Sequence, residues 1–413
     1  MRVEPVSFPS FGCEGPMGRR SRKKLVETPG TAPGSTTLIP RAVYRHSQGA
    51  NPSGTDRYRD DTARAQDYPR MKPNWKNGRR AWYARQRSNP EHEWWPMFSN
   101  DQKSAIEAAR AAWTPTRRLV VPAVEEAMYE PISVLDTGFV RLVDYMGGDD
   151  GIVQGARVSY GKGTKSTSDD RGLIRYLMRN RHTSPFELAV IKLHVRAPIF
   201  VTRQWFRHRT ASINEYSARY SVLEKEFYFP RPEDIAVQSA SNKQGRGTTL
   251  PPEQAQQVLD LLRDDAARCY DHYLELLNED AAGGTVDPTR PSIARELARM
   301  NLPVNIMTQF YWQINLWNLL HFLRLRADSH AQYEIRAYAD AILGLVEKWV
   351  PLTFGAFRDY MRDATLLSGP ALRVLRAVMA GTPVDPKAEG LSRREITELA
   401  DLFPEIAPRL NAG

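Results

Sequence analysis

The chain has 413 residues, 25% of them charged, and a formal net charge of +9. It contains no run of about 18 apolar residues and no apolar segment near its N-terminus, which excludes a membrane span and a secretory signal and leads us to expect a cytoplasmic protein. Its two cysteines, Cys13 and Cys269, are too few for a disulfide framework or a four-thiolate metal site.

The positive charge belongs to the first hundred residues. Residues 1–100 hold 18 Lys and Arg, 9 Asp and Glu and 11 of the 29 prolines, whereas basic and acidic residues balance in the remainder. This composition, without apolar periodicity, predicts a basic, disordered leader, which we extend over residues 1–130. The Trp, Tyr and Arg residues between 75 and 87 suit an arm for nucleic acid, but a solvated tail or an over-extended gene start fits better.

A folded domain is expected over residues 131–365, where apolar spacing becomes regular. Residues 169–178 predict an amphipathic helix, because apolar side chains recur at spacings of three and four. The alternation of residues 191–196 predicts a half-buried strand. Pro198 suits the first turn of a helix that runs to about residue 208.

Three longer helices are predicted further along the chain. They cover residues 252–278, 306–322 and 330–349. The expected buried side of the first consists of Val258, Leu262, Cys269, Tyr273 and Leu276. Residues 366–413 are expected to form a short helical C-terminal extension, since Ser392 and Glu395 have the spacing of a capping box.

The most informative segment is residues 207–221, which read RHRTASINEYSARYS. Arginines, a histidine, a glutamate and several hydroxyls in one short stretch suit a site that grips an anion and orients a polar ring. Guanidinium groups donate hydrogen bonds in pairs to phosphate and to the carbonyl edges of a pyrimidine. Arg219, Arg299 and Arg326 are candidates for that task. The Ser and Asn content of the second half predicts a loop shaped around a ligand.

Other chemistries lack their patterns. The histidines do not show a metal-ligand spacing such as His-Glu-x-x-His, so no metal site is expected. Residues 155–163 fail the phosphate-loop pattern, and no Gly-x-Gly-x-x-Gly follows a strand, so a conventional dinucleotide fold is not supported. The serines of residues 207–221 lack a nucleophile elbow, and Cys269 falls on the expected buried side of its helix. We therefore expect no protein nucleophile.

Six separated motifs together make residues 131–362 resemble the flavin-dependent thymidylate synthases. They are ARVSY at 156–160, HTSPFE at 182–187, PIFVTRQWF at 198–206, the segment 207–221, RMNLP at 299–303 and LRADSHAQ at 325–332. The resemblance implies a mixed α/β (α+β) fold with helices packed on a mainly antiparallel sheet, in a homotetramer with shared active sites. It implies that the domain at 131–365 is catalytic and makes dTMP from dUMP. The expected cofactor is FAD, with NADPH as reductant and 5,10-methylenetetrahydrofolate as one-carbon donor.

The same resemblance implies roles for individual residues. The expected dUMP contacts are Gln204, Arg207, Glu215, Ser217, Ala218, Arg219, Arg299 and Arg326. The expected FAD contacts are Ser159, Ser184, Glu187, Arg207, His208, Arg209, Glu215, Asn315, His321 and His330. Arg326 is the expected catalytic residue, because a cation beside N3 of uracil favours loss of the N3 proton. The chain departs from the family pattern at Ala218, Leu188 and Trp317, where Gly, His and Arg are frequent.

Two alternatives stay open from the sequence. The nearer one keeps the fold and the flavin but modifies another pyrimidine nucleotide. The more distant one is a nucleic-acid-binding protein that acts through the basic leader; it is disfavoured because every charged residue of segment 207–221 is intact.

Overall fold

A five-stranded antiparallel sheet forms the centre of the structure, a computed structural model that describes residues 98–112, 114, 116–158, 170–240, 245–280 and 283–410. All of these lie in the second of two units of the chain, Pro73–Gly413. In sheet order the strands are β1 (Pro131–Val134), β2 (Gly138–Met146), β3 (Val190–Pro198), β7 (Met307–Asn315) and β4 (Ser212–Glu215). The predicted mixed fold with a mainly antiparallel sheet is confirmed.

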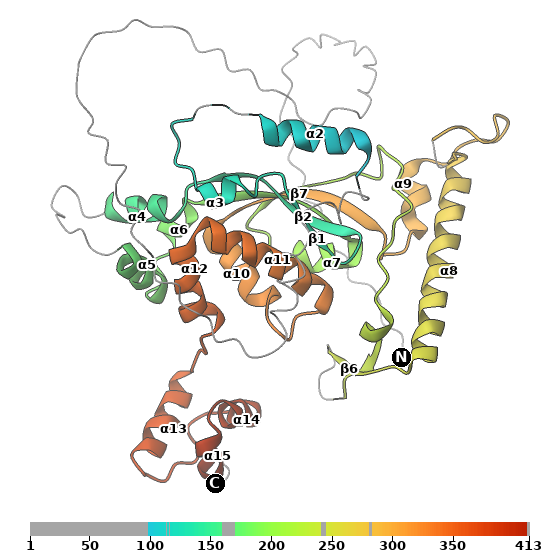
Figure 1. Ribbon diagram of the computed structural model, residues 1–413. Coiled ribbons are helices and arrows are strands. Elements are labelled where there is room, and N and C mark those ends of the chain that lie inside the picture. The colour runs from blue at the N-terminus through green and yellow to red at the C-terminus, as the bar shows by residue number, and fades with distance from the viewer. Residues whose placement is uncertain are drawn as a thin grey trace, which may run out of the picture. The chain divides into compact units, whose positions relative to one another are not determined.

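One face of this sheet is apolar and carries the helices that shape the candidate site. Side chains alternate across a strand, so β2, β3 and β7 present to this face Val140, Leu142, Ile191, Leu193, Val195, Phe310, Trp312 and Ile314. Helices α7 (Ile199–Trp205), α10 (Leu316–Arg326) and α11 (Tyr333–Trp349) lie on the same side of the sheet (Figure 1). The indole of Trp205, 0% exposed, lies 5.2 Å from that of Trp312 and anchors α7 on β7.

The opposite face of the sheet is polar and holds a hydrogen-bonded histidine. An Arg141 Nη2 atom lies 2.8 Å from Nδ1 of His194, and Nε2 of His194 lies 3.1 Å from Oε1 of Gln309. Because a guanidinium only donates, Nδ1 accepts and the ring proton resides on Nε2. Burial, with the charges of Arg141 and Arg196, lowers the pKa of His194 to about 3.

Acid is therefore expected to destabilise the fold through His194. The unfolded histidine binds a proton below about pH 6.5 and the folded one only below about pH 3, so the unfolded state takes up more protons in between. The free energy of unfolding should fall as the pH falls through this window, by about 2 kcal/mol from this group between pH 7 and pH 5. Denaturant titrations at several pH values measure the slope, and His194→Gln, which keeps one acceptor and one donor, should flatten it. An equal slope in the variant would assign the effect to other groups.

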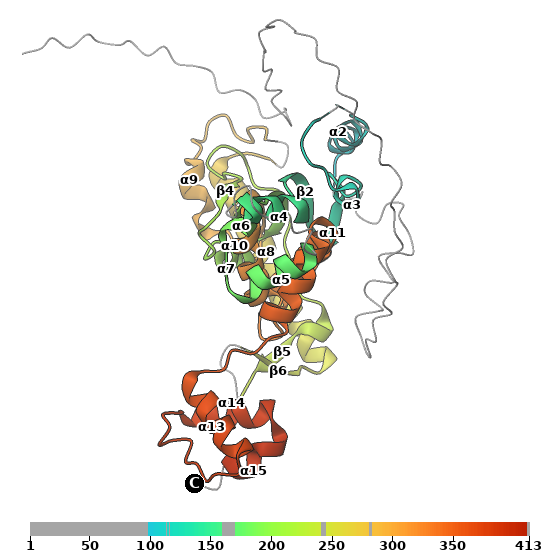
Figure 2. The same ribbon diagram turned by 90° about the vertical axis from the view of Figure 1, so that its left-hand side faces the viewer.

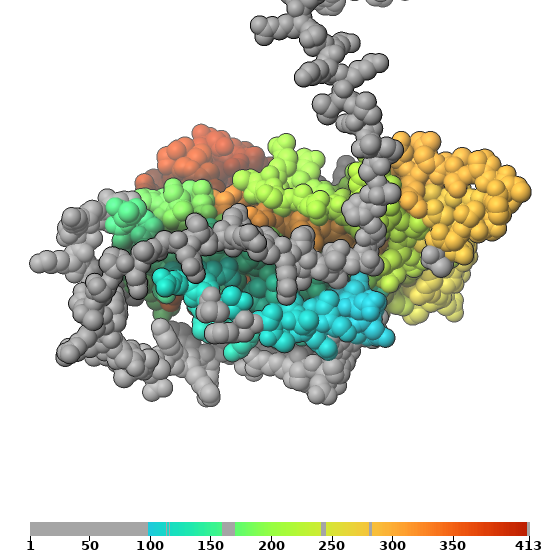
Figure 3. All heavy atoms as spheres, turned by 90° about the horizontal axis from the view of Figure 1, so that it is seen from above, coloured from blue at the N-terminus to red at the C-terminus, as the bar shows by residue number. Residues whose placement is uncertain are grey.

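The helix α2 (Asn100–Ala111) begins at a capping box formed by Ser99 and Gln102. It packs through Phe98 and Ile106 on Phe139, and it forms part of the surface seen in Figure 3. The next helix, α3 (Pro122–Glu125), contributes Val124 to the main core. The prediction of disorder over residues 1–130 is therefore wrong for residues 98–112 and 116–130, because their few apolar side chains are enough to reach the sheet. Residues 1–97 lie outside the described part of the chain.

The predicted helix at 306–322 is also wrong in its first half. Residues 307–315 form the long strand β7, between β3 and β4, and α10 begins only at Leu316. Phe310, Trp312 and Ile314 are buried at a period of two, which decides for a strand. Within the predicted loop of segment 207–221, residues 212–215 form strand β4.

Helix α8 (Pro252–Leu277) lies within one residue of the predicted bounds and buries Tyr273 as expected, but most of its other buried residues differ from the predicted ones. Its buried residues are Ala255, Leu259, Ala266, Tyr270, Tyr273 and Leu277, whereas Leu262 and Leu276 are exposed. The helix carries apolar residues on two adjoining sides, and only its partners decide which is covered. Cys269 is a free, half-buried thiol at the edge of that side.

Short elements complete the domain. They are α4 (Asp149–Val158), α5 (Asp170–Arg179), α6 (Ser184–Glu187), η3 (Pro232–Asp234), β5 (Ala236–Gln238), β6 (Arg246–Thr249), α9 (Arg295–Ala298), η4 (Arg299–Asn301), α12 (Pro351–Phe357) and the π-helical turn η5 (Arg358–Arg362). Strands β5 and β6 pair in a sheet of their own.

The C-terminal helices share a separate small core. They are α13 (Gly369–Met379), α14 (Arg393–Leu402) and α15 (Ala407–Leu410), with the turn η6 (Pro404–Ile406) between the last two. The three helices lie close together in Figure 2. Their shared core includes Val374 and Leu399. The predicted capping box is present, since Oγ of Ser392 accepts from the Glu395 amide and the Glu395 carboxylate accepts from the Ser392 amide.

Candidate active site

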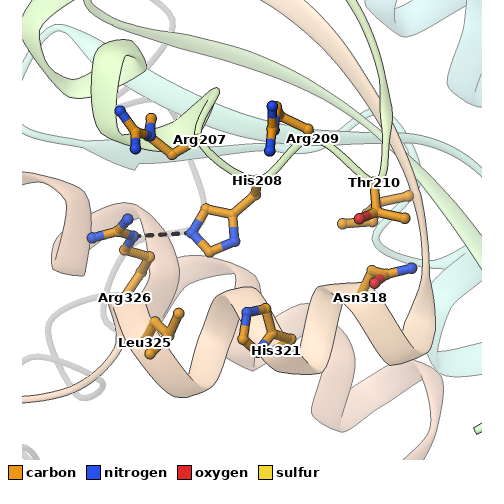
Figure 4. Close-up of a pocket in the computed structure, with 9 residues that line it drawn as sticks. Arg207, His208, Arg209, Thr210, Asn318, His321, Leu325 and Arg326 are labelled. Carbon is orange, nitrogen blue, oxygen red and sulfur yellow. Dashed lines mark hydrogen bonds between the residues drawn. The ribbon is translucent and has the colours of Figure 1, made fainter.

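A pocket of about 610 Å³ opens between the segment after α7 and helix α10. Its lining residues are Arg207, His208, Arg209, Thr210, Ile314, Asn318, His321, Leu325 and Arg326. Four are consecutive residues of segment 207–221, and four come from one side of α10. Figure 4 shows the two groups facing each other, with His208 directed toward α10.

The sequence around α7 explains how the pocket wall is held. Trp205 is buried among aromatic side chains at the last turn of α7, and its carbonyl accepts from the His208 amide at 3.0 Å. Phe206 and Arg207 form a turn, after which Arg207 and Arg209 lie on one side of the chain and His208 on the other (Figure 4). The His208 ring meets Phe322 of α10 edge-on at 4.9 Å.

His208 orients the guanidinium of Arg326. Nε of Arg326 donates to Nε2 of His208 at 3.1 Å, and its Nη2 lies 3.5 Å from the Gln204 carbonyl. Since Nε2 accepts, the neutral ring carries its proton on Nδ1. Burial, then the charges of Arg326 and His321, lowers the pKa of His208 to about 4. The ring is thus a neutral acceptor at physiological pH, and it does not compete with Arg326 for an anion.

Arg207 and Arg209 supply positive charge that the described residues do not neutralise. Both side chains are exposed, and within the described part of the chain neither makes an ion pair or a side-chain hydrogen bond. Most other arginines of the domain pair with a carboxylate, as Arg196 does with Glu224 at 3.0 Å. Two unpaired guanidinium groups beside a hydroxyl and an amide form a strong site for phosphate.

A second group of the expected residues surrounds Glu215, at the end of strand β4. Its Oε1 accepts from Oγ1 of Thr308 on β7 at 3.0 Å. Partial burial raises the pKa of Glu215, while the Thr308 hydroxyl and the charges of Arg203 and Arg299 act in the opposite direction. This carboxylate lies among cations from α7 and η4, two elements far apart in the sequence.

Ser217, Ala218 and Arg219 follow directly in the turn after β4. Ala218 is 7% exposed and belongs to a small core beneath α8. Oγ of Ser217 accepts from the Arg219 amide at 3.3 Å, which fixes the turn. The Arg219 side chain, 56% exposed, pairs with Glu296 at 3.2 Å and points into solvent in the single chain.

The structure thus divides the expected residues. Those that line the pocket are Arg207, His208, Arg209, His321 and Arg326, and Gln204 adjoins it through its carbonyl. Glu215, Ser217, Ala218, Arg219 and Arg299 belong to the second group. Asn315 caps α10 by accepting from the Asn318 amide at 3.0 Å. Ser184, Glu187 and His330 are exposed and do not line the pocket, and Ser159 lies outside the described residues.

Four lining residues were not among the expected contacts: Thr210, Ile314, Asn318 and Leu325. The last two could have been found, because Asn318, His321 and Leu325 are spaced by three and four and share one face of α10. Thr210 follows directly on the expected triplet 207–209. Ile314 gave no signal, since an apolar residue of a central strand normally belongs to the core.

The donor set of the pocket fits a flavin dinucleotide. Unpaired Arg207 and Arg209 match the two charges of a diphosphate, and Thr210 and Asn318 offer neutral donors beside them. The neutral ring of His208 and the side chain of Leu325 provide surface for a flat heterocycle. The pocket lining would therefore hold a flavin dinucleotide through its phosphates and its ring system.

No helix among the described residues is long and apolar enough to cross a bilayer. The same residues contain no group of three His, Cys, Asp or Glu side chains that could hold a metal ion.

Known proteins resemble this chain over the region that carries the site. Residues 141–352 match the family model described as thymidylate synthase complementing protein. A flavin-dependent thymidylate synthase of Rickettsia bellii is 55% identical over 289 residues, which are 70% of this chain and 98% of that protein. One of Ruegeria pomeroyi is 54% identical over 306 residues, covering 74% and 99%. Among solved structures, the UMP/dUMP methylase PolB of Streptomyces cacaoi with 5-Br UMP is 37% identical, with a TM-score of 0.47 over 55% of this chain and 95% of that one.

Proposed function

The chain belongs to the family of flavin-dependent thymidylate synthases, and on that premise we propose that the pocket between residues 207–210 and α10 holds FAD and dUMP for the synthesis of dTMP. The one-carbon donor is 5,10-methylenetetrahydrofolate and the reductant is NADPH. We assign this chemistry to residues 131–365. Flavin dependence follows from family membership, whereas the role of each residue is our proposal.

One observation carries the assignment of roles. A neutral His208 accepts from Nε of Arg326, and the Gln204 carbonyl lies 3.5 Å from its Nη2. Nη1 and the second hydrogen of Nη2 then remain for a ligand, beside the unpaired Arg207 and Arg209. Such an arrangement suits a nucleotide, because it offers a fork of donors for a heterocycle next to cations for its phosphates.

Arg326 is proposed to make the uracil ring reactive. C5 of uracil is a weak nucleophile, and a cation beside N3 and its flanking carbonyls favours the electron-rich ring that has lost its N3 proton. The fixed direction of the guanidinium contributes through positioning, which can account for several kcal/mol of a barrier. When bound, FAD supplies the hydride chemistry. Cys269 does not line the pocket, which agrees with a reaction without a cysteine nucleophile.

The active form is proposed to be a homotetramer with shared sites. On one chain the expected dUMP residues fall into two groups, around Arg326 and around Glu215, and Arg219 extends into solvent. A neighbouring subunit could bring the second group onto the nucleotide. Light scattering should give a mass of four chains. Mixing Arg219→Ala and Arg326→Ala chains should restore activity if the two residues act from different subunits.

The decisive experiment is dTMP detection from dUMP, with FAD, NADPH and the folate omitted in turn. Every omission should abolish product, and UMP or dCMP in place of dUMP should give none. Methylated product from UMP or dCMP but not from dUMP would favour another pyrimidine substrate. A preparation that is colourless and stays apo when FAD is added would contradict the assignment of the pocket.

A further inference from the structure

A buried carboxylate lies behind Gln204, outside the pocket lining. Glu334, in the first turn of α11, is 2% exposed. Its Oε1 accepts from the Tyr228 hydroxyl at 3.1 Å and from Nη2 of Arg246 on β6. Its Oε2 accepts from Nε2 of Gln332 at 2.9 Å. Both oxygens are therefore used, and three donors from separate segments converge on one side chain.

This carboxylate determines the direction of a side-chain relay. A carboxylate paired with a guanidinium has no hydrogen to donate, so Gln332 must turn its NH₂ group toward Glu334. The Gln332 Oε1 atom then faces the other way, where it accepts from Nε2 of Gln204. Gln204 in turn uses its NH₂ group as donor to Gln332, and its Oε1 has no partner among the residues that the structure describes. The polarity of two amides thus follows from one acidic residue.

We propose that Glu334 is a positioning residue, which through Gln332 makes Gln204 present a hydrogen-bond acceptor to the nucleotide. The inference rests on the proposed function, in which Gln204 touches dUMP. The matching group on the ligand is a donor. The sugar hydroxyl of dUMP is the donor that agrees with the proposed role of Arg326, because an acceptor on the only ring N–H of uracil, at N3, would oppose the loss of the N3 proton. With the amide reversed, a donor would meet that donor, and the nucleotide would lose a hydrogen bond and gain a repulsion.

The relay makes an unusual prediction for Glu334→Gln. The new amide keeps its oxygen toward Tyr228 and Arg246, which both donate, so its NH₂ faces Gln332. Gln332 must then turn, Gln204 must follow, and the NH₂ of Gln204 points to the ligand. We expect the affinity for dUMP to fall at least about tenfold, with FAD still bound, because a buried polar group is left mismatched.

The reciprocal exchange tests the direction of the relay. In Gln204→Glu alone, a carboxylate faces the Gln332 oxygen, and dUMP affinity should again fall at least about tenfold. In the double variant, Gln332 can donate to the carboxylate introduced at position 204 and accept from the amide introduced at position 334. Every hydrogen bond then has a partner, and position 204 again presents an acceptor. We expect the affinity of this double variant for dUMP to return to within about threefold of the wild type.

Calorimetric titration of dUMP into the FAD-loaded proteins gives the affinities of the wild type, the two single variants and the double variant. Losses that multiply in the double variant, to about 100-fold or more, would overturn the relay. Gln332→Met, at an exposed position, gives a second test that leaves the buried carboxylate in place. It should weaken dUMP binding as Glu334→Gln does, and adding Glu334→Gln to it should cost nothing further.

A second ligand identifies the group of dUMP that donates to Gln204, and a control variant tests whether the loss of affinity is specific to Glu334. If a sugar hydroxyl is the donor, 2′,3′-dideoxyuridine monophosphate should bind wild type and Glu334→Gln alike; if it is a ring N–H, that ligand should show the same loss as dUMP. Glu389→Gln removes an Arg-paired carboxylate from the segment between α13 and α14 and should leave dUMP affinity unchanged. A wild type that binds dUMP but makes no dTMP would contradict the proposed function while leaving the relay open to the same binding test.

Discussion

Arg326→Ala is expected to lower dTMP formation at least about 100-fold, on the scale seen when one charge-stabilising donor is removed from an active site. The reason is the geometry of the guanidinium, which lines the pocket while its Nε is held by His208 and its Nη2 lies near the Gln204 carbonyl. Without it, the cation that we propose to favour the ionised ring is lost. The measurement is single-turnover dTMP formation with saturating dUMP.

The loss should appear in turnover rather than in flavin content. The Arg326→Ala protein should keep its yellow colour, because Arg207 and Arg209 remain. Arg324→Ala, two residues earlier on α10 and outside the pocket lining, is the matched control and should be near wild type. Arg326→Lys should recover only part of the rate, since an ammonium has no planar fork of donors. Unchanged turnover in Arg326→Ala would remove this residue from the chemistry.

The double variant Arg207→Ala, Arg209→Ala is expected to bind FAD at least about 100-fold more weakly. Hydrogen bonds to charged groups contribute about 1.5–3 kcal/mol each, and these two guanidinium groups have no protein partner within the described part of the chain that would need to be released. Equilibrium titration of apoprotein with FAD, followed by flavin fluorescence, measures the change. The wild-type affinity should fall with added salt, and that dependence should weaken in the variant.

A control with the same loss of charge separates local from general electrostatics. Arg263 and Arg268 lie on α8, are exposed, and pair with Asp260 and Asp265. Replacing both by Ala removes two positive charges outside the pocket lining and should leave FAD affinity within about twofold, because exposed charges are well screened. Equal weakening in both double variants would mean that net charge, and not this pocket, attracts FAD.

Local patterns in the sequence predicted the elements with a strong period. The helices at α5, α8 and α11 and the strand β3 were expected close to where they lie. The capping box at Ser392 was also expected, because caps depend on neighbours three residues apart. Strand β7 was missed, since Phe310, Trp312 and Ile314 fit both a helix and a strand until the sheet covers one side of them.

The sequence by itself determined the family, because six motifs between residues 156 and 332 carry the resemblance, and the flavin dependence follows from that family. Only the tertiary structure decided which residues of these motifs meet. It brought Arg326 to His208 across 118 positions, left Arg219 in solvent, and connected Gln204 to Glu334 through Gln332. Such contacts arise from the packing of α7, α10 and α11 on a shared sheet face, and no local pattern encodes the distance between segments that lie so far apart.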